Sequence, residues 1–125
     1  MPMPDLPRPL ILQVRSANAT GGGADTLVLN SARYMPELGY DTICAYLHPP
    51  ADGEALARRA EEAGAPFASV PDRHAFDWKV VSTLVQLCRE KNVSIWHSNE
   101  YKSNFLGLVV RRYWPMRLVS TVHGW

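Results

Sequence analysis

The amino-acid sequence predicts an α/β fold in which a Rossmann-like parallel sheet carries helices on both of its faces. Short apolar runs alternate along the chain with longer segments whose apolar residues recur every three or four positions. Because strands that alternate with helices form right-handed βαβ units, the strands are expected to be parallel. The 125 residues, 46% of them apolar, suffice for one domain with a hydrophobic core.

The first half of the chain predicts strand 10–14, loop 15–23, helix 24–38, strand 41–47, helix 53–63 and strand 66–70. Apolar residues recur at helical spacing from Val28 to Leu38, and Gly39 ends that helix. Pro36 lies inside its last turn, where a proline lacks the amide hydrogen and distorts the helix. The next helix is rich in alanine and charged residues, which predicts a surface position, and Gly64 caps it.

The second half predicts helix 77–91, strand 94–97, helix 100–113 and a buried strand over 118–122. Val81, Leu84 and Cys88 share one face of the first of these helices. Helix 100–113 is apolar on more than one side, so it is expected to be covered on several sides. Pro115 separates it from the last strand, whose short apolar run is typical of a strand inside a sheet.

Composition narrows the class of protein. The net charge is +1, from 13 basic and 12 acidic residues, and no long basic tract is present, which argues against nucleic-acid binding. Cys44 and Cys88 fall inside predicted elements, as reduced core thiols of a cytoplasmic protein do. Residues 1–8 are expected to be a flexible, proline-rich leader rather than a signal peptide, and 9–125 to be the domain. The longest strongly apolar stretch, 105–110, is too short to span a bilayer.

A glycine-rich turn joins the first strand to the first helix. Gly22 and Gly23 allow the backbone to approach a ligand closely, and the free N–H groups at a helix start favour an anion. The alternative is a plain turn with Asp25 as the helix N-cap. A dinucleotide-binding fingerprint is excluded because it needs glycine where Thr26 stands. A P-loop is excluded because the Gly-Lys-Ser/Thr sequence is absent.

Two further polar clusters follow later strands. His97, Asn99 and Lys102 lie between the fourth strand and the fourth helix, and His123 follows the last strand. In a doubly wound sheet the first, fourth and fifth strands are neighbours, and their carboxyl ends face one crevice. Gly22, His97 and His123 are therefore expected to line that crevice.

Simpler roles for these residues stay open. Ser98 or Asn99 could cap the fourth helix, with the charges that follow in solvent. A zinc site built from His97 and His123 would lack a third ligand with recognisable spacing, so no metal is expected. A Ser-His-Asp triad would need a G-x-S-x-G turn, which the sequence lacks.

The residues resemble family 4 glycosyltransferases, which are retaining enzymes of the GT-B fold with two Rossmann-like domains facing each other across a cleft. The resemblance covers residues 9–125 and rests on the glycine turn at 22–25, GYDT at 39–42, IWHSNEYKSNFLGL at 95–108 and STVHGW at 120–125. It implies that the chain is one half of a GT-B architecture, the N-terminal, acceptor-side domain. It also implies that this domain is truncated and that the C-terminal donor domain is absent.

The resemblance implies roles for single residues. Gly22 and Gly23 match the glycines whose backbone meets the donor phosphate or the acceptor. His123 matches the histidine that hydrogen-bonds the transferred sugar, so it is the expected catalytic residue. The loop that faces the acceptor is matched by His97, Asn99 and Lys102.

The function expected from this resemblance is the transfer of a hexose-type sugar from a nucleotide-sugar to a sugar or lipid-linked acceptor, with retention of configuration. The nucleotide-sugar is a co-substrate, and neither a cofactor nor a metal is expected. The isolated chain is expected to be inactive because the donor domain is missing. The alternative hypothesis is a non-enzymatic Rossmann-like module that binds a phosphorylated small molecule through the same glycine turn.

A last sequence feature suggests a peripheral contact with the inner face of a membrane. Segment 111–117 combines three arginines with Tyr113, Trp114 and Met116, next to an unusually apolar helix. Aromatic and basic residues in combination bind anionic bilayers. The favoured alternative is that Trp114 and Met116 pack against chain that is missing here, with the arginines in solvent.

Overall fold

The computed structural model describes residues 8–16, 34–64, 66–72 and 77–121. Within them, five parallel strands form one sheet in the order β3-β2-β1-β4-β5. The strands are β1 (Leu10–Ser16), β2 (Asp41–His48), β3 (Phe67–Pro71), β4 (Ile95–Ser98) and β5 (Arg117–Ser120). The helices are α2 (Gly53–Ala63), α3 (Trp78–Lys91) and α4 (Tyr101–Arg111), with short 3₁₀ turns η1 (Met35–Leu38) and η2 (Pro50–Asp52). This architecture confirms the predicted Rossmann-like α/β fold.

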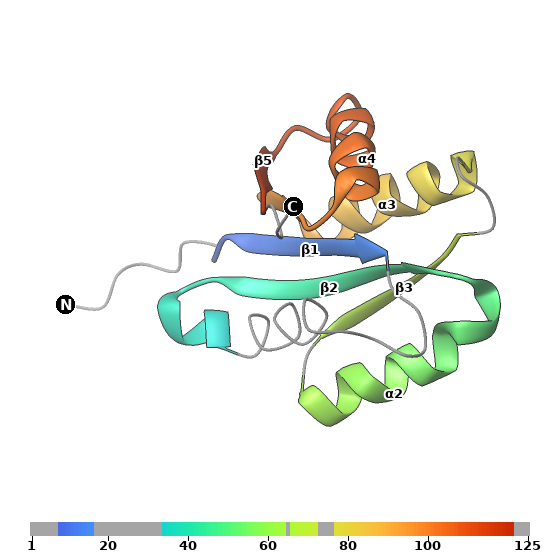
Figure 1. Cartoon of the computed structure of the whole chain (residues 1–125). Coiled ribbons are helices and arrows are strands. Elements are labelled where there is room, and N and C mark those ends of the chain that lie inside the picture. The colour runs from blue at the N-terminus through green and yellow to red at the C-terminus, as the bar shows by residue number, and fades with distance from the viewer. Residues whose placement is uncertain (1–7, 17–33, 65, 73–76, 122–125) are drawn as a thin grey trace.

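β1 lies at the centre of the sheet, where the order of the strands reverses. It pairs with β2 along one side and with β4 along the other. The first, fourth and fifth strands are therefore neighbours, as predicted. Figure 1 shows α2 on one face of the sheet and α3 and α4 on the opposite face. Open α/β sheets bind ligands outside the carboxyl ends of their strands at such a reversal.

The described elements begin and end within two residues of the predicted ones, apart from the first helix. Positions 24–33 of that helix lie outside the described residues, and its end is the 3₁₀ turn η1. Pro36 stands at the start of η1, and Gly39 ends it with a φ of 94°. The distortion expected from Pro36 is thus present, because a proline ring favours a tight turn at this point over a regular α-helix.

The last strand does not have the buried position that its apolar run predicts. Among the described residues β5 pairs only with β4, which places it at the edge of the sheet. Val119 is 48% exposed, and Arg117 and Ser120 are exposed as well. A short apolar run indicates that a strand forms, but burial depends on what packs against that strand, and here one side of β5 has no described neighbour.

β4 and α4 pack closely against each other through Trp96 and Gly107. The Trp96 side chain is fully buried, and its indole Nε1 donates hydrogen bonds to Ser98 Oγ at 2.9 Å and to the Ser103 carbonyl oxygen at 3.1 Å. A Cβ atom on Gly107 would lie 2.6 Å from that nitrogen. The absence of a side chain at Gly107 therefore lets α4 lie directly on the indole.

Residues that follow α4 fold back into the core. Met116 is buried, and Trp114 packs against the core and donates its indole N–H to the Val93 carbonyl oxygen at 2.8 Å. The hypothesis that these two side chains need missing chain to cover them is wrong, because Met116 belongs to the core cluster and Trp114 packs against it. No helix among the described residues is long and apolar enough to cross a membrane.

Both cysteines are free thiols in the core, as predicted. Burial raises the pKa of Cys88 from 9.0 to about 12, because its apolar surroundings disfavour the thiolate.

This shift predicts a loss of stability at alkaline pH. The unfolded thiol ionises near pH 9.0 whereas the folded thiol stays protonated up to about 12, so the unfolded state loses its proton first. The contribution of Cys88 is therefore complete below pH 9.0 and decreases as the pH rises from 9.0 to about 12. Urea denaturation across this range should show a shallower alkaline decline for Cys88→Ala than for the parent chain. Equal declines would contradict the prediction, since the other titrating groups are common to both proteins.

Candidate functional site

The carboxyl ends of the parallel strands meet at one edge of the sheet, and polar residues gather there. The described members of this group are Ser16, His48, Asp72, His97, Ser98, Asn99, Glu100 and Thr121. The first turn of α4 begins at the same edge and adds Lys102. We refer to this group of residues as the carboxyl-edge cluster.

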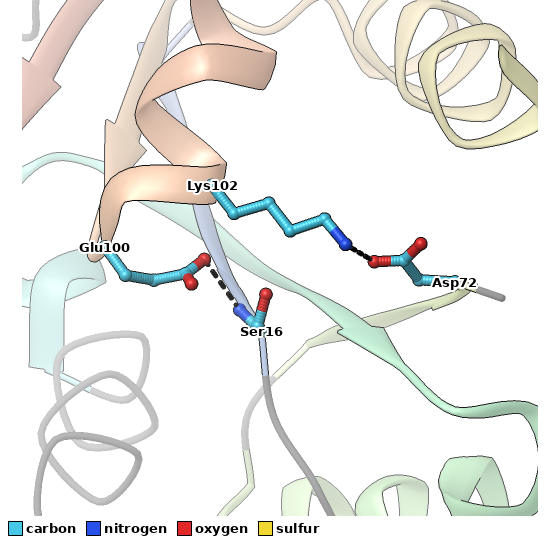
Figure 2. A network of polar contacts seen from close by, with 4 residues as sticks. All are labelled: Ser16, Asp72, Glu100 and Lys102. Atoms are coloured by element: carbon cyan, nitrogen blue, oxygen red, sulfur yellow. Dashed lines mark hydrogen bonds and ion pairs between the residues drawn. The ribbon is translucent and has the colours of Figure 1, made fainter. Parts of the chain in front are cut away.

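Glu100 caps α4 and joins it to the central strand. The hydroxyl of Ser103 accepts the backbone N–H groups of Asn99 at 3.1 Å and of Glu100 at 3.2 Å, within a capping box formed by Glu100 and Ser103. The Glu100 carboxylate accepts the backbone N–H of Ser16 at 3.0 Å (Figure 2). The prediction that Ser98 or Asn99 caps α4 is therefore wrong. The Glu100 carboxylate connects the end of β1 to the start of α4.

Asn99 is buried at the point where the strand order reverses. Its side-chain amide donates to the Val14 carbonyl oxygen at 3.2 Å and to the His97 carbonyl oxygen at 3.3 Å. The same amide nitrogen makes a longer contact of 3.5 Å with Gln13 Oε1. The Asn99 side chain thus bridges the ends of β1 and β4 and holds the floor of the site together.

Lys102 forms an ion pair with Asp72, which follows β3. Figure 2 shows the lysine side chain extending from the first turn of α4 toward the end of β3. The Asp72 side chain is 9% exposed and the Lys102 side chain 31% exposed, so water screens the pair only in part. The backbone N–H of Asp72 donates to the His48 carbonyl oxygen at 2.8 Å, and this bond fixes the aspartate beside β2.

Asp72 was not identified from the sequence. The signal that could have found it is an acidic residue directly after a strand, at the edge where Lys102 was expected. The strand was predicted to end at 70, which left this position in a loop. Its partner is 30 residues away, and only the strand order brings the two together.

Two histidines occupy different positions at the same edge. The imidazole Nε2 of His97 contacts the Thr121 hydroxyl, which links β4 to the residue after β5. His48 is buried, with Nδ1 2.6 Å from the Pro49 carbonyl oxygen and Nε2 against the Ser69 hydroxyl. A Cβ atom on Gly53 would lie 2.9 Å from the His48 ring, so the start of α2 rests on this imidazole. His48 was not identified from the sequence, and its contacts indicate a structural role.

The structure brings three of the predicted site residues to one edge, namely His97, Asn99 and Lys102. Gly22, Gly23 and His123 lie outside the described residues. The described part of the chain holds no group of three His, Cys, Asp or Glu side chains that could bind a metal ion. The charged groups among the described residues of this edge are the ion pair of Lys102 with Asp72 and the carboxylate of Glu100.

The ion pair between Lys102 and Asp72 predicts a measurable effect on stability. Lys102→Met would leave a nearly buried carboxylate without its cation and should lower the free energy of unfolding by about 2 kcal/mol, between the values typical of exposed and buried pairs. In a double-mutant cycle, Asp72→Asn should remove most of this loss, since the amide carries no charge. Urea denaturation of the four proteins measures the coupling, and strictly additive effects would show that the pair does not stabilise the fold.

Comparison with known proteins identifies a family whose sequence profile matches the chain and solved structures with a similar fold. The sequence profile described as Glycosyltransferase Family 4 matches residues 21–125. No curated protein matches the chain significantly.

Three solved structures share the fold. A glycosyltransferase from Rickettsia africae ESF-5 is 18% identical, with a TM-score of 0.67 over 96% of this chain and 31% of its own. HepE from Anabaena, crystallised in complex with UDP, is 18% identical, with a TM-score of 0.66 over 92% of this chain and 29% of its own. MurG from Acinetobacter baumannii is 13% identical, with a TM-score of 0.63 over 94% and 37%. The chain thus spans about a third of the length of these structures.

Proposed function

The chain belongs to glycosyltransferase family 4, and from this membership we propose that it forms the N-terminal, acceptor-side domain of a retaining glycosyltransferase. The complete enzyme would transfer a hexose-type sugar from a nucleotide-sugar to a sugar or lipid-linked acceptor. The observation that carries the proposal is the carboxyl-edge cluster, which lies at the reversal of a Rossmann-like sheet in a member of this family. The proposed C-terminal domain would bind the donor.

Within this proposal, the carboxyl-edge cluster binds and orients the acceptor. The Lys102 ammonium group donates hydrogen bonds to an acceptor hydroxyl or phosphate, and Asp72 balances its charge. One carboxylate oxygen of Asp72, Oδ1, is buried without a hydrogen-bond partner among the described residues. Asn99 and Glu100 hold these groups in place through their bonds to β1.

The remaining proposed roles fall on residues outside the described ones. Gly22 and Gly23 would offer backbone N–H groups to the donor phosphate or the acceptor, and His123 would hydrogen-bond the transferred sugar. These groups act by positioning and by stabilising the charge that develops on the departing phosphate. The proposed reaction uses neither a metal nor a further cofactor.

The proposal is tested by comparing the 125-residue chain with a longer protein in which a C-terminal donor domain follows the same residues. Release of nucleoside diphosphate from UDP-activated and GDP-activated hexoses measures turnover in the presence of simple sugar acceptors. Only the longer protein should turn over, and the anomeric proton signal of its product should show the configuration of the donor. Rapid transfer by the 125-residue chain, or an inverted product, would refute the proposal. Tight binding of a phosphorylated compound without any transfer would favour the non-enzymatic module.

A further inference from the structure

The ion pair of Lys102 with Asp72 is anchored at both of its ends. The backbone N–H of Asp72 donates to the His48 carbonyl oxygen at 2.8 Å, which holds the aspartate beside β2. Lys102 stands in the first turn of α4, and Glu100 ties that turn to β1 through the backbone N–H of Ser16 (Figure 2). Because both partners extend from anchored backbone, the ammonium group is directed toward the carboxylate.

Among the described residues, Lys102 is the cation that balances the charge of Asp72. Oδ2 of the aspartate contacts the ammonium group, and Oδ1 is buried without a hydrogen-bond partner in this part of the chain. The Asp72 side chain is 9% exposed, so water screens its charge only weakly. The positive charge of Lys102 is therefore largely neutralised at the point where this side chain reaches solvent.

Glu100 adds a second negative charge to the same turn of α4. Its carboxylate accepts the backbone N–H groups of Ser16 and Ser103, which are neutral donors. Figure 2 shows this carboxylate and the ammonium group of Lys102 extending from the start of the helix. An anionic group that approached Lys102 would therefore meet two carboxylates and one ammonium group.

We propose that Asp72 is a specificity-determining residue, which makes the site at the Lys102 ammonium group select an uncharged, hydroxyl-bearing part of the acceptor over a phosphate or carboxylate. This inference rests on the proposed function, in which Lys102 binds the acceptor. A hydroxyl oxygen accepts a hydrogen bond from the ammonium group and brings no charge. A phosphate would be repelled by the carboxylate or would have to displace it, and displacement would leave a nearly buried anion without its cation. The selection thus comes from repulsion of the wrong ligand.

Inorganic phosphate is the probe that tests this selection in the 125-residue chain itself. The amide chemical shifts of Tyr101, Lys102 and Ser103 report binding at the site, in a titration at constant ionic strength. Phosphate should cause little change in these signals in the parent chain. Asp72→Asn should strengthen the affinity for phosphate at least about 10-fold, because it removes a negative charge that contacts the ammonium group.

Two further variants control for the change in charge. Asp41→Asn makes the same substitution in an exposed ion pair, in which Arg8 Nε lies 3.2 Å from Asp41 Oδ1 at the opposite edge of the sheet. It should leave the phosphate affinity at Lys102 within about twofold, since water and salt screen charges so far apart. Lys102→Met combined with Asp72→Asn removes the cation and should abolish the added affinity. Circular dichroism should be the same for the parent and the three variants.

The two-domain enzyme of the proposed function tests the same selection in turnover. The measurement is kcat/KM for a simple sugar acceptor and for the same sugar carrying a phosphate group. The parent enzyme should prefer the uncharged sugar. Asp72→Asn should reduce this preference about 10-fold, mainly through a lower KM for the phosphorylated sugar. A loss of structure alone would lower both rates and leave their ratio unchanged.

Three outcomes would overturn the assignment of specificity to Asp72. The first is a parent chain that binds phosphate at Lys102 as tightly as the Asp72→Asn variant does. The second is added affinity that Asp41→Asn shares or that persists without Lys102. The third is an active enzyme whose preference between the two sugars is the same before and after Asp72→Asn. Absence of sugar transfer with any acceptor would refute the proposed function, whereas the phosphate titration decides separately whether Asp72 keeps anions away from Lys102.

Discussion

Gly107→Val is expected to lower the free energy of unfolding by about 3 kcal/mol, at the upper end of the usual effect of overpacking a core. The first added carbon alone would lie 2.6 Å from Nε1 of the buried Trp96 indole. The branched side chain would push α4 away from β4 or turn the indole. Either movement breaks the hydrogen bonds from Nε1 to Ser98 and Ser103, in a place that water cannot reach.

Urea denaturation measures this loss, as a lower midpoint with an unchanged dependence on urea concentration. Leu108→Val is the matched control, since it places valine on the same helix, one residue further on, at an exposed position. Its effect should be within about 0.5 kcal/mol of zero, as is usual for surface substitutions. If the two variants were equally stable, the contact between α4 and Trp96 would not be as close as the structure shows.

His123→Ala is expected to lower turnover on the order of 100-fold in the two-domain enzyme of the proposed function. Removing one hydrogen-bond donor that acts on the reacting group typically has an effect of this size. Because the interaction is proposed to strengthen in the transition state, kcat should fall and the KM for the nucleotide-sugar should change little. Steady-state kinetics with the nucleotide-sugar as the varied substrate separates the two constants.

His123→Gln provides the test of chemistry against structure. Its side-chain amide can donate a hydrogen bond from nearly the same position, so it should recover part of the lost turnover. A thermal unfolding midpoint equal to that of the parent enzyme is required of both variants. Turnover near the parent value for His123→Ala, or unfolding of the variant, would remove His123 from the site.

The fold could be predicted from the sequence because hydrophobic periodicity reports local structure directly. The alternation of short apolar runs with helical spacings predicted the order of the elements, and right-handed crossovers then predicted a parallel sheet. Burial could not be predicted in the same way. The apolar run that ends at Ser120 forms a strand as expected, but whether it lies inside or at the edge depends on the elements packed beside it.

The position of the site in the fold could be predicted from the sequence, but only some of its residue contacts could. His97, Asn99 and Lys102 were expected at the carboxyl edge because parallel strands end together there, and the structure places them so. Asp72 was missed because its partner lies on a different element, and the sequence shows no pairing between residues so far apart. The cap of α4 was misassigned because Ser98, Asn99 and Glu100 all suit a helix start, and only the geometry distinguishes them.

The central position of β1 has a consequence for how the polypeptide leaves the ribosome. β1 can pair with β2 soon after both are synthesised, but its other side pairs with β4, as in the register of Ile11 with Ile95. Until β4 emerges, the nascent chain therefore carries an unpaired strand edge at the centre of its future sheet. Such an edge is a template for pairing with other chains, and contacts distant in sequence form slowly. We expect the nascent N-terminal half to be the species that most needs a chaperone, until β4 pairs with β1 and removes the exposed edge.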